Sequence, residues 1–466
     1  MKLVFIGGGA HRVLSISRST LALPGVLDAG EICLCDLNLA RAEAMGRMLL
    51  KTPEQRRSGC RVTWTASLDE ALPGASVVAV IMPATSAEFF DRAQWVSLRH
   101  GFISSDNVSP TGSLCAVSIA PVLLDLARRM ERHCPDAWLI NFVNPVAVIS
   151  GMINNHTRIR ALGVCAGFTN HLSDIPRLFG RDEEAPGIDV LVAGINHLSY
   201  IVKASWKDGD LFAALDRHLS PDWQPPALHS RWDAGARSNI TRSVSRLARI
   251  WRELGVLVFS TEGDGMDHLM YDEAVADARE AYRELGAADL AASLARRAAA
   301  RADGDRTFND FLGRDLNDAF WRDFGDTDHR FRRHDEDIFV RIFAAFAGVR
   351  EARIVTSRPN HGAIAGIKDR HTVEYSQILF KNDIRPSSSV PLEIPDVVHG
   401  LAAGLAAHQT LLGDALATDD PRQLAHALVS YPVKPYSREL RSLYRELLGL
   451  RGGRFSPGAL RVVDEL

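Results

Sequence analysis

The first ten residues, MKLVFIGGGA, constrain the fold of this chain more than any other stretch. A short apolar run at residues 3–6 has the composition of a buried strand, and three consecutive glycines follow it. A periodic apolar segment at residues 13–23 then predicts a helix. Glycines between a strand and a helix let the backbone approach a pyrophosphate, which the free N–H groups at the helix N-terminus stabilise. The sequence therefore indicates a dinucleotide site at Gly7, Gly8, Gly9 and Ala10.

A second apolar run at residues 32–35 ends on Asp36, about thirty residues after the glycines. A carboxylate at this place accepts hydrogen bonds from ribose hydroxyls and repels a 2′-phosphate, so it favours NAD over NADP. The match to the pattern G-x-G-x-x-G is partial, because Arg12 stands at the third glycine position. An ordinary tight turn between a strand and a helix remains the alternative interpretation.

Length and composition narrow the class of protein. A chain of 466 residues is too long for one compact core, which predicts two lobes or a large extension. The net charge of −3 gives no reason to expect nucleic acid or a membrane as a partner, and no apolar run has the length of a membrane span. The N-terminal apolar run is too short for a signal peptide, so we expect a cytoplasmic protein whose six cysteines are mostly buried thiols.

Further apolar runs at residues 76–81 and 138–142 predict buried parallel strands, and ligands collect at the carboxyl ends of such strands. The loop after the first run would lie beside the nicotinamide. Asparagine amides after the second run could hold a nicotinamide amide or sugar hydroxyls, or could instead cap the following helix. Together with the polar loop at residues 101–112, these strand ends supply the candidate cofactor contacts Met82, Pro83, Asn107, Asn141 and Asn144.

Cys165 and His197 each lie at the end of a predicted strand, at residues 161–165 and 190–195. Because both occupy strand ends, they could converge on one site although they are far apart in sequence. A thiolate and an imidazole are a reasonable pair of ligands for a borderline divalent metal whose other positions go to substrate and water. On spacing alone, two ordinary packing side chains explain the same pattern.

Residues 260–268, STEGDGMDH, are rich in glycine and acid, and they predict a loop with candidate acid or base groups. The highly charged stretch at residues 301–333 is either a mobile flap or an interaction arm. Helical patterns dominate the rest of the second half, at residues 238–254, 270–300, 338–347, 395–416, 421–429 and 438–448.

Taken together, these landmarks resemble the NAD-dependent glycosidases of glycoside hydrolase family 4 and their relatives, including the NAD-dependent sulfoquinovosidases. The matching segments follow the family order over nearly the whole chain: Gly7-Gly8-Gly9, Asn141-x-x-Asn144-Pro145, Gly163-Val164-Cys165, Gly194-Ile195-Asn196-His197, and Asn360-His361-Gly362-Ala363-Ile364 with Val373-Glu374 behind it. The resemblance implies NAD, often Mn²⁺ held by Cys165 and His197, and a glycoside bound by Asn144, Asn196 and His197. It also implies a homodimer or homotetramer.

Together, pattern and resemblance predict an α/β protein. A Rossmann-like, doubly wound sheet at residues 1–195 would bind NAD. An α+β, largely helical domain at residues 196–466 would bind substrate and support oligomerisation. Two other interpretations stay open: a sugar or hydroxy-acid dehydrogenase that forms NADH, and an NAD-binding sensor without catalysis.

The resemblance implies a distinctive way to cleave a glycosidic bond. Transient oxidation at C3 of the sugar turns it into a ketone, which makes the proton on C2 acidic. A metal on the C2 and C3 oxygens lowers the pKa of that proton further. A base removes the proton, the C1 substituent leaves by elimination, water adds back, and the hydride returns to C3, so that the nicotinamide is not consumed.

Around the reacting groups, the sequence departs from the family pattern. Related α-phosphoglucosidases place an aspartate directly after the metal cysteine, where this chain has Ala166. As the acid we assign Asp106 or Asp264, and surface loop residues or helix caps explain these positions equally well. The same alternative holds for the base, which we assign to His268 or Tyr271. The departures point away from a plain 6-phosphoglucosidase. Among the acidic sugars (sulfoquinovoside, uronide or 6-phosphosugar), they favour a uronide or a sulfoquinovoside. Candidate cations for its acidic group are Arg12, Arg332, Arg333, His334 and Lys368.

Overall fold

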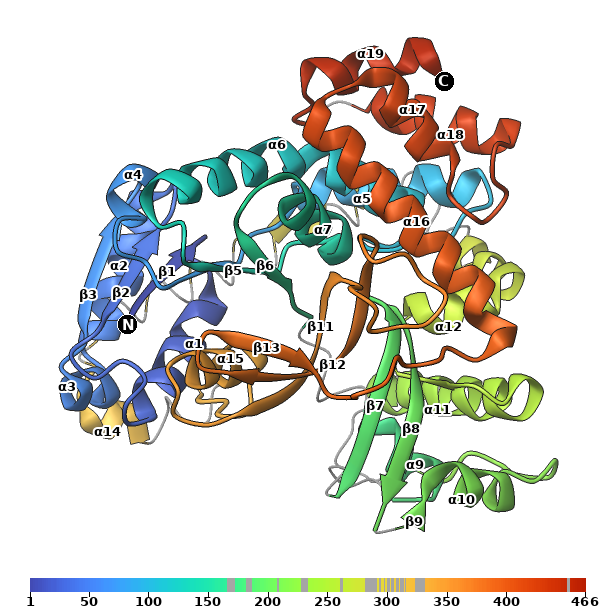
Figure 1. The fold of residues 1–466 in the computed structure, drawn as a ribbon, viewed down its shortest axis with the longest axis horizontal. Helices are drawn as coiled ribbons and strands as arrows, with labels where there is room; N and C mark the ends of the chain where they lie inside the picture. Colours follow the sequence, from blue (N-terminus) through green and yellow to red (C-terminus); the bar gives the residue numbers. More distant parts are fainter. Residues whose placement is uncertain are drawn as a thin grey trace.

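A computed structural model of the chain describes residues 1–165, 172–181, 187–207, 209–227, 234–259, 263–280, 332–450 and 453–466, together with 314, 316–322 and isolated positions between 291 and 310. Within this part of the chain the strands form one 13-stranded sheet (Figure 1). The strands are β1 (Lys2–Ile6), β2 (Glu31–Cys35), β3 (Arg61–Thr65), β4 (Val77–Val80), β5 (Trp138–Asn141), β6 (Arg160–Gly163), β7 (Ile188–Ile195), β8 (Leu198–Trp206), β9 (Gly209–Asp210), β10 (Leu257–Val258), β11 (Ala352–Pro359), β12 (Thr372–Phe380) and β13 (Asp383–Pro386).

Helices cover the sheet and form the C-terminal part of the molecule. They are α1 (His11–Ala22), α2 (Leu39–Leu50), α3 (Pro53–Ser58), α4 (Leu68–Ala71), α5 (Ala87–Arg99), α6 (Pro110–His133), α7 (Val146–His156), α9 (Asp174–Leu178), α10 (Leu211–His218), α11 (Ala234–Leu254), α12 (Gly263–Leu269), α14 (Asp318–Phe320), α15 (Ile338–Phe346), α16 (Asp396–Thr418), α17 (Pro421–Val429), α18 (Arg438–Leu448) and α19 (Pro457–Glu465).

The first six strands are parallel and lie in the order β3-β2-β1-β4-β5-β6. This is the strand order of a doubly wound dinucleotide-binding fold. Alternate residues of β1 enter different cores, because Leu3 and Phe5 pack with α1, α2 and α15, whereas Val4 packs with α6 and α7. Helices thus bury both faces of these strands, and the predicted Rossmann-like fold is confirmed.

The rest of the sheet is antiparallel and runs β6-β11-β12-β7-β8-β10. β7, which the predicted division places in the first domain, pairs here with β12 and β8. A boundary at residue 195 therefore falls inside the β7–β8 hairpin, and the parallel strands end at Gly163. A helix from the second half of the chain also packs against the first half, since Phe343 of α15 lies edge-on against Phe5 of β1.

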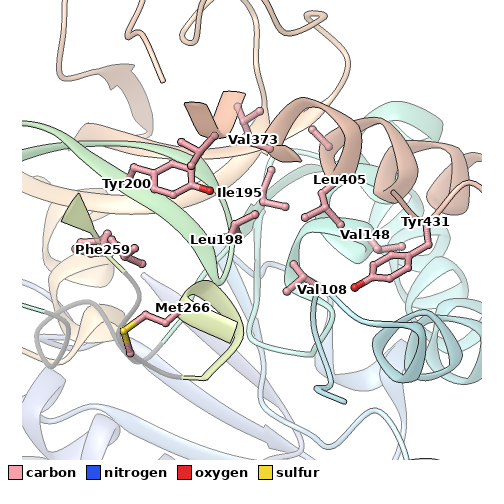
Figure 2. Close-up of a cluster of buried hydrophobic side chains, with 14 of the residues drawn as sticks. Val108, Val148, Ile195, Leu198, Tyr200, Phe259, Met266, Val373, Leu405 and Tyr431 are labelled. Atoms are coloured by element: carbon pink, nitrogen blue, oxygen red, sulfur yellow. The ribbon is translucent and has the colours of Figure 1, made fainter. Parts of the chain in front are cut away.

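A large hydrophobic core joins the antiparallel strands to the C-terminal helices. Figure 2 shows Val148, Leu405 and Tyr431 gathered among α7, α16 and the segment after α17, with Ile195 and Leu198 at the end of the β7–β8 hairpin. Among the described helices, α6 is long and apolar enough to cross a membrane, but 78% of its most apolar stretch is buried inside the protein, as in an ordinary core helix.

Some local predictions were wrong. Most of the predicted loop at residues 260–268 instead belongs to α12, because Met266 is buried and ties the segment to the core. The predicted loop at 101–112 ends earlier, since the Ser109 side chain caps α6 and Pro110 takes its first position. Residues 260–262, 281–290 and most of the charged stretch at 301–333 lie outside the described residues.

Candidate active site

The glycine turn after β1 lies against the end of β4. The N–H groups of Gly7 and Gly8 donate to the carbonyl oxygen of Cys35 over 2.9 and 3.0 Å. Gly7 has a φ of +83°, and a Cβ there would lie 2.1 Å from the carbonyl oxygen of Ile81. Both the backbone conformation and this contact exclude a side chain. Ala10 is the N-cap of α1 and supplies no side-chain hydrogen bond to its first turn.

Asp36 lies beside this turn at the end of β2. Its Oδ2 accepts a hydrogen bond from the Gly9 N–H over 2.9 Å. Arg41 Nε donates to the carbonyl oxygen of Gly9 over 2.7 Å, and a Cβ on Gly9 would lie 2.7 Å from Arg41 Cγ. The turn is therefore packed closely against neighbouring protein atoms and has a carboxylate at its rim, an arrangement that fits a dinucleotide with free ribose hydroxyls. The sequence pattern does not single out Arg41, because an arginine in a helix usually faces solvent.

Arg12 occupies the third glycine position but is not a free cation. Its Nη2 donates to Asp337 Oδ2 over 2.7 Å, and its guanidinium lies 4.9 Å from the ring centre of Phe142. The side chain thus ties the start of α1 to the segment before α15 and to the end of β5. These contacts explain how an arginine replaces the glycine that usually lets helix and strand pack closely.

The three candidate cofactor asparagines differ in the hydrogen bonds that their side chains already make within the protein. Asn141 is buried, and its side chain donates to the carbonyl oxygen and accepts from the N–H of Val143, both over 3.1 Å, so it holds its own turn. Asn107 Oδ1 accepts from the Val146 N–H over 3.3 Å, while its buried Nδ2 has no partner among the described residues. Asn144 is half-buried and precedes Pro145 in a cis peptide.

Met82 and Pro83 follow β4 at the same edge of the sheet as the glycine turn, where Met82 is half-buried and Pro83 is exposed. Asp106, in the loop before α6, is half-buried. Burial, with a smaller contribution from the Asp106 charge, raises the pKa of Cys115 to about 12. The Asp106 carboxylate therefore lies close to the start of α6.

The structure brings Cys165 and His197 together, with Cys165 Sγ 3.4 Å from His197 Nε2. Cys165 lies two residues beyond β6, at the carboxyl edge of the parallel strands. His197 forms a two-residue turn with Asn196 between β7 and β8, and it has a φ of +66°. The separation is about that between a sulfur and a nitrogen bound to one metal ion through bonds of ~2.3 and ~2.0 Å. The pair therefore fits a divalent metal.

Asp264 in α12 completes this arrangement from the other side of the imidazole. His197 Nδ1 donates to Asp264 Oδ2 over 2.8 Å. Burial alone would lower the pKa of His197, but the hydrogen bonds to Asp264 and Cys165 outweigh it and raise that pKa well above its usual range. A carboxylate on the second ring nitrogen is the usual support of a metal-binding histidine. Among the described residues, no group of three histidine, cysteine or acidic side chains could hold a metal, so further ligands would come from substrate or water.

The structure argues against His268 as the base. His268 is buried in α12, its Nδ1 donates to the backbone carbonyl oxygen of Asp264 over 2.7 Å, and its Nε2 accepts from the Tyr431 hydroxyl over 2.9 Å. Burial lowers the pKa of His268. Both ring nitrogens are engaged, so neither is open to a sugar. No sequence pattern singles out Tyr431, which lies in the segment between α17 and α18.

Tyr271 is also poorly suited to accept a proton. Its hydroxyl oxygen accepts a hydrogen bond from the Ile103 N–H over 3.2 Å, and burial raises its pKa to about 12. Asp264 differs from both, because its Oδ1 makes no hydrogen bond to the described residues. Asp264 was predicted as a possible acid, but its open Oδ1 makes it the candidate that the geometry favours as the base instead.

The structure shows local contacts for two of the cations that were expected to meet an acidic sugar. The carbonyl oxygen of Arg332 accepts from the Ser15 hydroxyl, and Arg333 lies 3.9 Å from Glu54, so this segment packs on α1 and α3. Lys368 is exposed in the turn after β11. Closer to Asp264 is Arg246 of α11, a residue that the sequence does not single out, which donates to Asp267 over 2.7 Å.

Known proteins with similar sequences or structures are glycosidases. An α-galactosidase from Bacillus subtilis is 27% identical over 46% of this chain, and the match spans 50% of that relative. An α-galacturonidase from the same organism is 23% identical over 96% of this chain and 97% of its own length. A 6-phospho-α-glucosidase from gut microorganisms, solved in complex with NAD and Mn²⁺, has the same fold, with a TM-score of 0.74 at 17% identity over 97% of this chain and 98% of that one.

Two family models cover most of the chain. The model of the family 4 glycosyl hydrolases matches residues 2–178, and the model of their C-terminal domain matches residues 192–433. The first match contains the glycine turn, Asp36 and Cys165, and the second contains His197 and Asp264. The chain is therefore a member of glycosyl hydrolase family 4.

Proposed function

We propose that this protein is an NAD-dependent glycosidase that cleaves glycosides of an acidic sugar, with an α-galacturonide as the first candidate. The observation that carries the proposal is the cluster of Cys165, His197 and Asp264, with a 3.4 Å Sγ–Nε2 and a 2.8 Å Nδ1–Oδ2 distance. Cys165 follows β6 at the same carboxyl edge of the parallel strands where Gly7 follows β1. A cofactor on the glycine turn and a sugar at the cluster would thus share one edge of the sheet.

The proposed reaction passes through oxidation at C3, deprotonation at C2, elimination of the aglycone and addition of water. When bound, NAD supplies a reversible hydride acceptor and a divalent metal stabilises negative charge on the sugar oxygens. Cys165 and His197 would hold the metal, and Asp264 Oδ2 fixes the imidazole. Asp264 Oδ1 remains to take the C2 proton, because it has no partner among the described residues.

The acid is assigned to Asp106, which lies in the loop that leads into α6. Asn107, its neighbour, has a buried Nδ2 without a partner among the described residues and can donate a hydrogen bond to the sugar or the nicotinamide amide. Unpaired buried donors are costly, so a ligand oxygen at this amide would contribute to binding. Asn144 and Asn196 remain the further candidates for sugar hydroxyls.

Two features support an acidic sugar other than a plain 6-phosphoglucoside. A relative that matches over nearly the full length is named an α-galacturonidase. This chain also has Ala166 directly after Cys165, where related α-phosphoglucosidases have an aspartate. Sulfoquinovosides and 6-phosphoglycosides remain the comparison substrates.

The test is incubation with aryl galacturonides, sulfoquinovosides and 6-phosphoglycosides in D₂O with NAD⁺ and Mn²⁺, followed by NMR of the released sugar. Deuterium at C2 without net NADH is the expected outcome, because the C2 proton exchanges and the hydride returns to C3. In Cys165→Ser, which keeps the size of the side chain, the glycosidase activity should no longer depend on added metal. Accumulation of NADH with an intact glycosidic bond would mean a dehydrogenase and would refute the proposal.

A further inference from the structure

A buried carboxylate anchors the turn that carries His197. Glu374 in β12 is 4% exposed, its Oε1 accepts from Asn196 Nδ2 over 2.8 Å, and its Oε2 accepts from the Ser199 hydroxyl over 2.9 Å. Asn196 directly precedes His197, and Ser199 follows it by two residues. One carboxylate thus bridges both sides of the turn.

This turn needs support from outside the hairpin. His197 adopts a left-handed backbone conformation, with a φ of +66°, which is unfavourable for a residue with a side chain. β12 lies next to β7 with Glu374 opposite Gly194, where a Cβ would come within 2.5 Å of Ser199 Cα. Figure 2 shows Ile195 of β7 and Val373 of β12 in the same buried hydrophobic cluster. Backbone pairing and packing therefore fix Glu374 under the turn.

We propose that Glu374 is a positioning residue of the metal site, which holds the Asn196–His197 turn so that one imidazole nitrogen faces Cys165 and the other faces Asp264. The inference rests on the proposed function, since it assigns a role around the metal pair. Glu374 touches neither Cys165 nor the ring of His197 by hydrogen bond, so it acts through Asn196 and Ser199.

The contact with Glu374 also determines which atom of the Asn196 side-chain amide faces the carboxylate. The structure has Asn196 Nδ2 donating to Glu374 Oε1, and the oxygens of a carboxylate offer that amide only acceptors. Burial raises the pKa of Glu374, and the two donated hydrogen bonds oppose that rise. Asn196 Oδ1 is consequently left as a buried acceptor without a partner among the described residues. It is suited to a ligand donor such as a sugar hydroxyl.

Binding of Mn²⁺ alone, followed by electron paramagnetic resonance without NAD or sugar, tests the proposal. Glu374→Gln keeps the side-chain size but replaces one acceptor oxygen by a donor, and we expect it to weaken Mn²⁺ binding about 10- to 100-fold, as loss of a supporting contact usually does. Ser199→Ala removes one hydrogen bond and should give a smaller loss. NAD affinity, measured by fluorescence, should stay unchanged in both variants.

Ser376→Ala is the matched control. Ser376 is buried on the same face of β12, and its hydroxyl oxygen accepts from the Val192 N–H of β7 over 2.9 Å, away from the turn. This variant should bind Mn²⁺ as the wild type does. An equal loss in Ser376→Ala and Glu374→Gln would mean general loosening of the sheet and would overturn the proposal.

The remaining outcomes separate this proposal from the proposed function. Wild-type Mn²⁺ affinity in a folded, NAD-binding Glu374→Gln variant would overturn the positioning role, whatever glycoside is cleaved. If that variant does not fold, unchanged Mn²⁺ affinity in Ser199→Ala would overturn it instead. Mn²⁺ binding that depends on Glu374 in a protein that cleaves no glycoside would support the positioning role and refute the glycosidase.

Discussion

Replacing Asp264 by asparagine tests the carboxylate that orients His197. The Nδ1–Oδ2 distance is 2.8 Å, and the two side chains are 11% and 9% exposed, so water screens the pair only weakly. A hydrogen bond to a charged group contributes about 1.5–3 kcal/mol. Because ~1.4 kcal/mol is a tenfold change in affinity, we expect Asp264→Asn to weaken Mn²⁺ binding by about one to two orders of magnitude.

The proton on the imidazole adds to this loss. An asparagine can donate from its Nδ2 to His197 Nδ1, which would place the ring proton on Nε2. That nitrogen lies 3.4 Å from Cys165 Sγ and must be unprotonated to bind a metal. The expected loss of Mn²⁺ affinity therefore lies toward the upper end of the range.

The assay is titration with Mn²⁺ at neutral pH, with the free ion followed by electron paramagnetic resonance and NAD affinity as the measure of an intact fold. Asp267→Asn is the control, because Asp267 lies on the same helix but accepts from Arg246 over 2.7 Å. It should leave Mn²⁺ affinity unchanged. Wild-type affinity in Asp264→Asn, or an equal loss in both variants, would refute the orienting role.

Three further predictions follow from the same structure. Asp36→Ala should weaken NAD binding at least tenfold, because it removes the acceptor for ribose hydroxyls, and an unchanged dissociation constant by fluorescence titration would contradict this. Gly7→Ala should abolish NAD binding and lower thermal stability, since its Cβ would lie 2.1 Å from the carbonyl oxygen of Ile81; a stable, NAD-binding variant would be inconsistent with the turn described. Burial lowers the pKa of His408 from 6.5 to about 4, so stability from this neutral histidine is complete above pH 6.5 and is lost as the pH falls toward 4. The loss amounts to about 3 kcal/mol in chemical unfolding, and it should disappear in His408→Asn.

Much of the parallel-stranded half was predictable from the sequence because its signals are local. The apolar strands, the glycines after β1 and the acid after β2 follow one another along the chain in the order of a dinucleotide-binding unit. The glycosidase family was likewise predictable, because five short segments occur in order. The helix at residues 263–269 was not predictable, since its glycines and acidic residues indicate a loop, whereas burial of Met266 favours a helix.

The roles within the site depended on the tertiary structure. The sequence by itself determined that Cys165 and His197 lie at strand ends, but their 3.4 Å separation depends on β11 and β12, which insert between β6 and β7 from far along the chain. The same applies to Asp264, whose role follows from its 2.8 Å contact with His197. Local patterns indicate which residues could carry chemistry, whereas the hydrogen bonds of His197 with Asp264 and of Asn196 with Glu374 join segments that no local pattern relates.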